Sequence, residues 1–301
     1  MDRFTELTTF VAVAEEGGFN SAARRLNKSP PTVTRLIASL EARIGTRLFT
    51  RTTRSIALTE VGQRFQRDAA RILGDLNEAE ASAAGAHVDP QGTLSVTAPV
   101  IFGRRYIAPI VRDFLDRSPK VTARLIFVDR IVNLIDDGID VAVRIGELPD
   151  SSLMALQVGH VRRVVVASPA YLDRHTPPAA PEDLSAHRVA TTVSSAESQT
   201  WEFRAGTAQR RVVIRPSFGA TTIDAQIDAA CAGWAIARVL SYQVADHLRD
   251  GRLIELLPGF EDRMSPVHLV HAEGQLGAAK IRAFVDHASR SLRAQARAWL
   301  P

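Results

Sequence analysis

The sequence of 301 residues is poor in cysteine and in long apolar runs, and each shortage excludes a class of protein. Its one cysteine, Cys231, can form neither an internal disulfide nor a set of thiolate metal ligands. No apolar run approaches the roughly 20 residues that a membrane helix needs. The first residues have neither the basic nor the apolar stretch of a secretory signal peptide. We therefore expect a cytoplasmic protein with no metal, no cofactor and no membrane partner.

Local catalytic signatures are also missing. The sequence contains no G-x-G-x-x-G, phosphate-binding P-loop, H-E-x-x-H, C-x-x-C or G-x-S-x-G motif. His268 and His271 resemble a metal-binding pair, but residues three apart on a strand face opposite sides of the sheet. We therefore expect the protein not to be an enzyme. An enzyme with a DNA-binding appendage stays the alternative, because many active sites have no local signature.

Positive charge is concentrated near the N-terminus, although the formal net charge of the chain is only +4. Between residues 20 and 55, Glu41 is the only acidic residue. The basic residues of this segment are Arg24, Arg25, Lys28, Arg35, Arg43, Arg47, Arg51 and Arg54. Such a block is typical of a nucleic-acid-binding module, and a solvated basic face is the alternative. The chain length favours about two domains.

The basic block lies within a helix-turn-helix pattern. Apolar residues at three- and four-residue spacing predict a helix over residues 4–14, and residues 19–26 form a second, short one. Asn27 tolerates the left-handed conformation of a turn. Ser29 is a good N-cap for a third helix over residues 30–44, and prolines are tolerated in its first turn. The pattern predicts a helix-turn-helix, with an ordinary helical hairpin as the alternative.

A wing and a long helix follow. Residues 47–49 and 55–58 are short extended pieces on either side of a basic turn, which predicts a β-hairpin. Thr59 begins a helix that reaches about Gly85, and its apolar residues recur every three or four positions, as in a coiled coil. The expected dimerisation residues are Val61, Phe65, Ala69, Ile72, Leu76 and Ala79. The alternative is a helix that packs on its own domain.

Beyond the long helix the pattern becomes that of an α/β domain. Strands are expected near residues 93–97, 121–128, 139–145, 161–167, 188–192, 211–215, 234–239, 253–257 and 266–271. Helices are expected near residues 104–117, 131–137, 223–232, 242–250 and 278–299. The alternation predicts a mostly parallel sheet.

At this point the chain resembles the LysR-type transcriptional regulators over essentially its whole length. The N-terminal residues that carry the resemblance are 10–14, Gly18-Phe19, Ala22-Ala23, Leu26, Ser29, Val33-Thr34-Arg35, Leu40-Glu41, Ile44-Gly45, 48–51 and 58–62. In the C-terminal part the residues are 140–146, 168–172 and 253–257. Pro30-Pro31 and Pro99 depart from the usual residues of the family, so they bear on base preference and on ligand contact.

The resemblance implies a domain plan. It comprises an all-α winged helix-turn-helix DNA-binding domain (1–58), a linker helix for dimerisation (59–86), a hinge (87–91) and an effector-binding domain (92–301) similar to periplasmic binding proteins. The effector-binding domain would consist of subdomain I (92–161 and 268–301) and subdomain II (163–266). The connections between them would lie near residues 162–165 and 265–268. The implied partners are double-stranded promoter DNA, a small-molecule effector, a second copy in a dimer or tetramer, and RNA polymerase.

The DNA-binding residues are expected on the third helix and the wing. The N-terminal side chains of a recognition helix enter the major groove, so Thr32 and Arg35 are predicted to contact bases, and Pro30 and Pro31 thymine methyls. The resemblance suggests that Ser29 and Thr34 hold phosphate, with helix capping as the alternative. Phosphate contacts are predicted for Arg51 and Arg54, and Thr53 of the same basic turn is expected to contact DNA.

The effector site is expected where strands end, because ligands in open α/β sheets bind at the carboxyl ends of strands. A small organic acid is predicted there, since hydroxyls and helix N-terminal amides satisfy carboxylate oxygens. The predicted effector-binding residues are Thr97, Pro99, Val100, Ile101, Asp129, Arg144, Gly146, Thr192, Val193, Ser194, Thr221 and Thr222.

Three alternatives stay open at this site. Arg144 is either a ligand contact or one half of a structural ion pair. Cys231 is either a small core residue or a thiol sensor, and the second role would need an exposed, electropositive setting. The whole domain is either a sensor or a vestige on an architectural DNA-binding protein.

Overall fold

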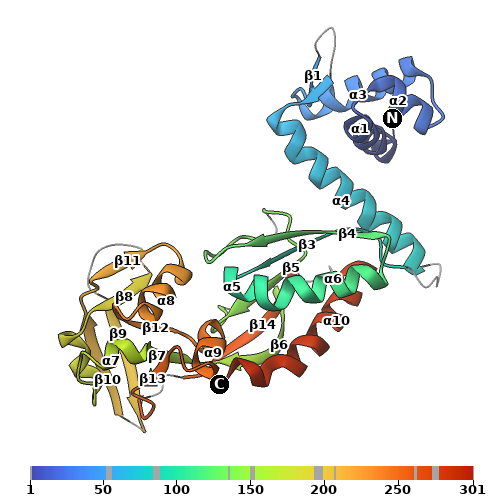
Figure 1. The fold of residues 1–301 in the computed structure, drawn as a ribbon. Coiled ribbons are helices and arrows are strands. Elements are labelled where there is room, and N and C mark those ends of the chain that lie inside the picture. Colours follow the sequence, from blue (N-terminus) through green and yellow to red (C-terminus); the bar gives the residue numbers. More distant parts are fainter. Residues whose placement is uncertain are drawn as a thin grey trace.

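The computed structural model describes residues 2–51, 56–83, 89–134, 136–149, 153–192, 199–206, 208–260, 263–272 and 278–300. Figure 1 shows an N-terminal helical domain at one end of a long helix and a two-lobed C-terminal domain near the other end. In the described part of the chain, no helix combines the length and the apolar character that a membrane crossing requires.

The N-terminal domain has the predicted winged helix-turn-helix form. Its elements are α1 (Arg3–Glu16), α2 (Phe19–Arg25), α3 (Pro30–Ile44), β1 (Phe49–Arg51) and β2 (Ile56–Leu58), and β1 pairs antiparallel with β2. The turn between α2 and α3 depends on Asn27, whose φ is +52°. The Phe10 ring lies 5.3 Å from that of Phe49 and 5.2 Å from that of Phe65, and these rings join the three helices, the wing and the next helix into one core.

A buried carboxylate fixes α3 against α1. Glu6 is only 2% exposed, and it accepts hydrogen bonds from Ser39 Oγ at 2.6 Å and from the Arg43 guanidinium at 2.9 and 3.1 Å. The hydrogen bond from Ser39, followed by the contacts with Arg43, lowers the pKa of Glu6 against the opposing effect of burial. Because both partners lie on α3, this network holds α3 in place against α1.

The long helix α4 (Glu60–Ala83) begins at the predicted cap, where Thr59 Oγ1 accepts from the backbone N–H of Gly62 at 2.9 Å. Two of the predicted dimerisation residues in its first half pack within their own chain instead. Ala69 is fully buried by its own chain and Phe65 packs in the same core, so both lie against α1 rather than on a free face. Val61 and Ile72 are 40% and 41% exposed, and Leu76 is half-buried.

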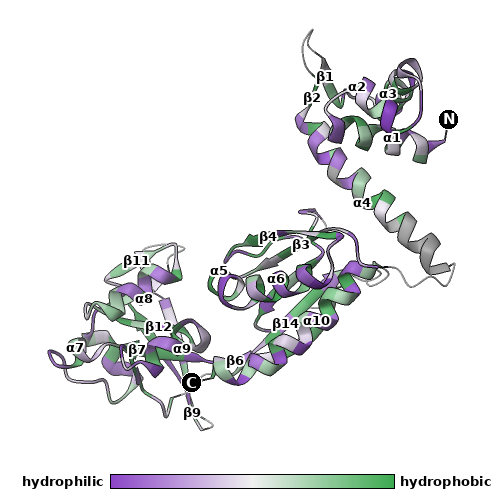
Figure 2. Ribbon diagram, turned by 45° about the vertical axis from the view of Figure 1, so that its right-hand side comes forward, coloured by the Kyte–Doolittle hydropathy of each residue, from purple (hydrophilic) through white to green (hydrophobic). Residues whose placement is uncertain are grey.

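The first lobe of the C-terminal domain contains a five-stranded mixed sheet in the order β4-β3-β5-β14-β6. Its strands are β3 (Gly92–Ala98), β4 (Val121–Phe127), β5 (Val141–Ile145), β6 (Leu153–Val161) and β14 (Ser265–Ala272). Its helices are α5 (Val100–Phe102), η1 (Gly103–Ile107), α6 (Ala108–Arg117), α10 (Ala279–Gln295) and η4 (Ala296–Trp299). Figure 2 shows apolar strands such as β14 inside the lobe and polar stretches along α10.

The second lobe contains another five-stranded mixed sheet, in the order β11-β8-β12-β7-β13. Its strands are β7 (Arg163–Ala167), β8 (Val189–Thr192), β11 (Phe218–Ala220), β12 (Ile236–Leu240) and β13 (Ile254–Leu256). The remaining elements are α7 (Pro169–Leu172), η2 (Pro181–Ala186), the antiparallel hairpin of β9 (Gln199–Ala205) and β10 (Ala208–Ile214), α8 (Ile223–Cys231) and α9 (Ser241–Arg249).

The chain passes between the lobes twice. The first passage is at Arg162, between β6 and β7, as predicted. The second follows β13, which ends at Leu256, and precedes β14, which pairs with β6 from Ser265 onward. The connection predicted near residues 265–268 therefore falls within β14. The two lobes also touch through aromatic rings, because Phe102 of the first lobe lies 5.2 Å from Tyr242 of the second.

Two secondary-structure predictions are wrong. The helix expected over residues 131–137 is a loop with a single turn, because Asn133 and Asp136 bond to each other locally through side chain and backbone. The helix expected from residue 104 begins at Val100, whose N–H donates to Asp129 Oδ1 at 3.1 Å. Sequence reasoning also missed the strands β6, β9 and β11.

Candidate DNA interface and effector cavity

The outward face of α3 carries the predicted DNA-binding residues. Val33, Leu36, Ile37 and Leu40 are buried in the domain core, so the opposite face of the helix is turned to solvent. That face and the preceding cap contain exposed Ser29, Pro30, Pro31 and Arg35, with Thr32 and Thr34 half-buried.

The cap of α3 shows that Ser29 has a structural role. Ser29 Oγ accepts from the backbone N–H of Thr32 at 3.4 Å, and the two side-chain hydroxyls lie 2.8 Å apart. This is the capping alternative for Ser29, and it does not remove the exposed hydroxyl from reach of a phosphate. Arg51 lies at the end of β1, while its side chain, Thr53 and Arg54 lie outside the part that the structure describes.

A cavity of about 1320 Å³ lies between the two lobes of the C-terminal domain. The first lobe lines it at the ends of β3, β4 and β5, and the second lobe at the end of β8 and the start of α8. The predicted residues that line it are Thr97, Pro99, Val100, Asp129, Arg144, Thr192, Thr221 and Thr222. The strand ends named by the rule for open α/β sheets therefore meet at one cavity, and its use as the effector site stays a prediction.

Four predicted effector residues are not placed in the cavity. Ile101 is 4% exposed and belongs to the core of the first lobe, because α5 turns its side chain inward. Gly146 is absent from the lining, and its N–H donates to the carbonyl of Pro266 at 2.9 Å. Val193 and Ser194 lie outside the described residues.

Arg144 is the half-buried cation of the cavity. It lies on β5 opposite His268 of β14, and its guanidinium donates to the backbone carbonyl of Val132. Burial lowers the pKa of this guanidinium. Among the described residues, no carboxylate lies within ion-pair distance of Arg144, so the structural ion-pair interpretation finds no support there.

Two of the other predicted polar groups at the cavity, Thr97 and Asp129, have hydrogen-bond partners within the protein. Thr97 Oγ1 donates to the carbonyl of Ile126 at 2.7 Å, which leaves its lone pairs as acceptors. Asp129 caps α5 through the N–H of Val100, so its carboxylate has a structural function at the cavity edge. Thr222 is the N-cap residue of α8 and its side chain makes no capping hydrogen bond.

Sequence reasoning missed the apolar wall of the cavity. The wall includes Ile131, Val132, Leu134, Leu148, Pro149 and Leu153. Ile131 is 86% exposed in the loop after β4, where the sequence suggested a helix. An apolar run directly after a predicted strand end was the available signal, and the mistaken helix over residues 131–137 concealed it.

Family models match nearly the whole chain in two segments. A model of bacterial regulatory helix-turn-helix proteins of the lysR family matches residues 4–63. A model of the LysR substrate binding domain matches residues 87–293, which is more than half of the chain. The chain belongs to the LysR family of transcriptional regulators.

Individual relatives agree with this assignment. An HTH-type transcriptional repressor of Pseudomonas aeruginosa is 33% identical over 290 residues, which cover 95% of this chain and 91% of the relative. The HTH-type transcriptional regulator CrgA of Neisseria meningitidis is 32% identical over 282 residues, with 93% and 94% covered. This LysR-family chain is therefore similar to transcription regulators along its full length, and the enzyme alternative is set aside.

Solved structures show the same fold. The structure of CrgA from Neisseria meningitidis aligns with a TM-score of 0.62 at 32% identity and covers 96% of this chain and 98% of CrgA. The full-length Vibrio cholerae virulence activator AphB aligns with a TM-score of 0.60 at 26% identity, with 95% and 98% covered. This LysR-family regulator therefore combines a DNA-binding helix-turn-helix domain with an effector-binding domain.

Proposed function

We propose that this regulator binds operator DNA through α3 and the wing, and that a small organic acid in the interlobe cavity modulates its activity. The acid is the finer part of the proposal, and a single observation carries it. Arg144 is a half-buried cation on the cavity wall, and a backbone carbonyl is the hydrogen-bond partner recorded for it. An anionic ligand group would offset the desolvation of this guanidinium and could accept two parallel hydrogen bonds from it.

The rest of the cavity suits an acid with an apolar body. Apolar side chains from residues 131–134 and 148–153 supply a wall for an aromatic or aliphatic group. On the second lobe, Thr221 and Thr222 precede α8, whose first backbone N–H groups favour negative charge. Both lobes contribute lining residues, so the ligand would favour one relative position of the lobes. We infer that it shifts the regulator between two quaternary arrangements on DNA.

The domain boundaries are a further part of the proposal. We propose residues 1–58 as the DNA-binding domain, 59–86 as the dimerisation helix, 87–91 as the hinge and 92–301 as the effector-binding domain. Of the predicted dimerisation residues, Val61, Ile72 and Leu76 are exposed or half-buried, and we propose that they contact a second copy, in a dimer or tetramer. The regulator would act in the cytoplasm, where the DNA lies, and RNA polymerase is a further proposed partner.

On DNA, Thr32 and Arg35 would contact bases with Pro30 and Pro31, while Ser29 and Thr34 hold phosphate. For Arg51, Thr53 and Arg54 on the wing we propose phosphate contacts. Arg51→Ala should weaken specific and random DNA binding alike and reduce the salt slope by about one unit. An unchanged slope with a loss restricted to the operator would make Arg51 a base contact.

Calorimetry tests the acid. Benzoate, benzamide and benzylamine share an apolar ring and differ in charge, so benzoate should bind the full chain tightest, in the micromolar range. Arg144→Met should weaken benzoate at least tenfold. Arg130→Met is the matched control, because Arg130 lines the same cavity but is exposed at its rim, and it should change affinity less than about threefold. A preference for benzamide or benzylamine would reject the acid and leave the regulator assignment intact.

A further inference from the structure

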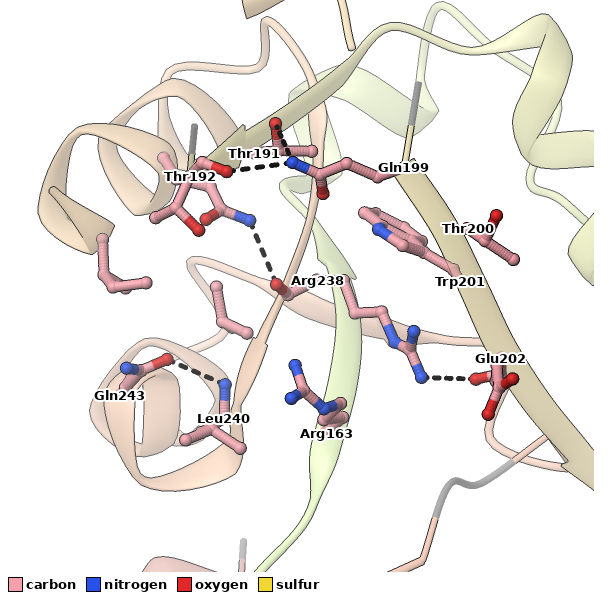
Figure 3. Close-up of a pocket in the computed structure, with 13 residues that line it drawn as sticks. Arg163, Thr191, Thr192, Gln199, Thr200, Trp201, Glu202, Arg238, Leu240 and Gln243 are labelled. Carbon is pink, nitrogen blue, oxygen red and sulfur yellow. Dashed lines mark hydrogen bonds between the residues drawn. The ribbon is translucent and has the colours of Figure 1, made fainter. Parts of the chain in front are cut away.

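A second cavity, of about 460 Å³, lies entirely within the second lobe. It is lined by residues of β7, β8, β12, α8 and α9 on one side and of β9 on the other. Figure 3 shows the side chains of Arg163, Arg238 and Glu202 around this space. The inner side chains of the hairpin, such as Trp201, Phe203 and Val212, pack on the sheet and close most of this space. The cavity is the part of the hairpin–sheet interface that apolar side chains do not fill.

Two arginines share the sheet face that forms the floor of this cavity. Arg163 on β7 lies opposite Leu240 on β12, and Arg238 lies opposite Val165, so the arginines are diagonal neighbours on antiparallel strands. Diagonal neighbours are roughly 7–8 Å apart, within reach of long side chains on the same face. Both side chains line the cavity. Two guanidinium groups therefore converge on one space, where an anion would offset their mutual repulsion.

Arg238 is fixed before any ligand arrives. Its guanidinium donates to the backbone carbonyl of Glu202 at 2.6 Å, and its Cζ lies 4.6 Å from the centre of the Phe203 ring and 5.5 Å from that of Trp201. Figure 3 shows Arg238 reaching from β12 toward Glu202 on β9, with Arg163 beside it. The Glu202 carboxylate binds Arg211 at 2.9 Å. A preorganised guanidinium loses little conformational freedom on binding an acid group.

Neutral polar groups form a further part of the lining, beside Glu202 and the apolar Trp201, Ile223, Val239 and Leu240. Gln226 is 2% exposed, and its amide donates to the carbonyl of Arg238 at 3.0 Å. Gln199 donates to the carbonyl of Thr192 at 3.0 Å, and the Thr191 hydroxyl lies 3.5 Å from the same amide. Side-chain amides and hydroxyls both donate and accept hydrogen bonds, so they match ligand hydroxyls. The interlobe cavity borders this one and also includes Gln199 in its lining, but its wall is mainly apolar.

We propose that this cavity is a second ligand site, for a small hydroxyl-bearing acid whose carboxylate or phosphate contacts Arg163 and Arg238. The amides and hydroxyls of Gln226, Gln199 and Thr191 bind the hydroxyl groups of the ligand. The residues that also line the interlobe cavity are Thr192, Gln199, Ile223, Leu240 and Gln243. Every lining residue of the proposed site belongs to the second lobe, so this lobe alone supplies the whole site. The site therefore goes beyond the proposed effector function of the interlobe cavity.

Calorimetry on the full chain with three matched sugars tests the site. Gluconate carries a carboxylate, glucose 6-phosphate carries a phosphate, and glucose carries neither. We expect one of the two acids to bind at one site per chain. Glucose should not bind. The acid that binds shows whether the site takes a carboxylate or a phosphate. Arg163→Gln should weaken that acid at least tenfold, because Arg163 is exposed and its replacement leaves the core intact.

Two further variants separate the alternatives. Arg204→Gln is the matched control, since Arg204 is exposed on β9, which borders the cavity, but does not line the cavity itself. It should leave affinity within about twofold. Arg144→Met should not affect the sugar acid, and Arg163→Gln should not affect benzoate. Binding of glucose, no binding of either acid, equal affinity in Arg163→Gln, or loss in Arg144→Met would each overturn the second site. None of these results bears on benzoate in the interlobe cavity.

Discussion

The DNA-binding domain and the effector-binding domain assemble their functional surfaces from very different lengths of chain. The proposed DNA-contacting face of α3 comes from residues 29–35, which are neighbours in sequence. The interlobe cavity draws on residues from Thr97 to Val270, brought together by two sheets and two passages between lobes. Helix periodicity alone fixes which residues share a face of α3, whereas strand pairing decides which residues meet in the cavity.

The same two regions hold their cations in different surroundings. Arg35 is exposed, whereas the Arg144 guanidinium is half-buried and burial lowers its pKa. Charges exposed to solvent are screened by salt, and buried ones much less so. DNA affinity should therefore fall steeply with ionic strength, while affinity for an acid in the cavity should fall only slightly. Each prediction below tests one side of this contrast.

The largest effect is expected on α4. Ile72→Asp with Leu76→Asp would place two charges where we propose a contact between subunits, at a cost of several kcal/mol. Dimerisation and operator binding should be lost together, because one winged domain contacts only one half-site. Gln63→Asp is the control, since Gln63 is exposed on the same helix. Sedimentation that shows an intact dimer in the double variant would reject α4 as the main contact.

Blocking the cavity should remove the effector response and leave DNA binding unchanged. Thr222→Trp would fill the space at the start of α8 from an exposed position, so the lobe should still fold. We expect benzoate affinity to fall about a hundredfold and operator affinity to stay within twofold, as measured by calorimetry and gel shift. A parallel loss of operator binding would mean that the two domains are not functionally separable in this way.

Arg35→Ala should reduce operator affinity by about 1–3 kcal/mol and relax the base preference, since a base contact acts only on its own sequence. Arg24→Ala on α2 is a suitable comparison, because Arg24 is also exposed and basic but lies outside α3. Fluorescence anisotropy with operator and with random DNA measures the affinity of both variants and separates a base contact from a phosphate contact. If Arg35→Ala weakens both DNAs equally, Arg35 is a phosphate contact.

Glu6→Gln should destabilise the N-terminal domain by about 1–3 kcal/mol in urea unfolding, because it removes the charged acceptor that holds Ser39 and Arg43. The pKa of Glu6 is lowered from an ordinary value of 4.5 in the folded state. Its contribution is therefore present above pH 4.5 and lost as the pH falls through the lower folded value. The variant has no carboxyl group at this position. Its free energy of unfolding should therefore fall less than that of the wild type as the pH is lowered through this range. Parallel pH profiles of wild type and variant would contradict the assignment.

The smallest effect is expected at Cys231. Burial raises the pKa of its thiol, and Cys231 Sγ lies 3.4 Å from His247 Nδ1. Because the thiolate is the reactive form, iodoacetamide should modify Cys231 slowly at pH 7 and faster above pH 9. Mass spectrometry measures both rates. Fast modification at pH 7 would revive the thiol-sensor alternative that the sequence left open.

The sequence predicted the helix-turn-helix closely, and the reason is local. Asn27 was predicted to form the turn through its left-handed backbone and Ser29 to cap the third helix through its side chain, and the structure has both at those points. The strand-end rule likewise located Thr97, Arg144 and Thr222 at one cavity. These predictions needed only periodicity, capping and the order of strands and helices.

Tertiary structure alone decided the remaining features. The apolar side chains of Ile131, Val132 and Leu134 form a cavity wall only because the two lobes enclose one space there. Ala69 follows the coiled-coil spacing, yet α1 covers it. Arg163 and Arg238 are 75 positions apart, and only the register of β7 with β12 makes them neighbours. Periodicity specifies which residues share one face of an element, but the partner of that face depends on long-range packing.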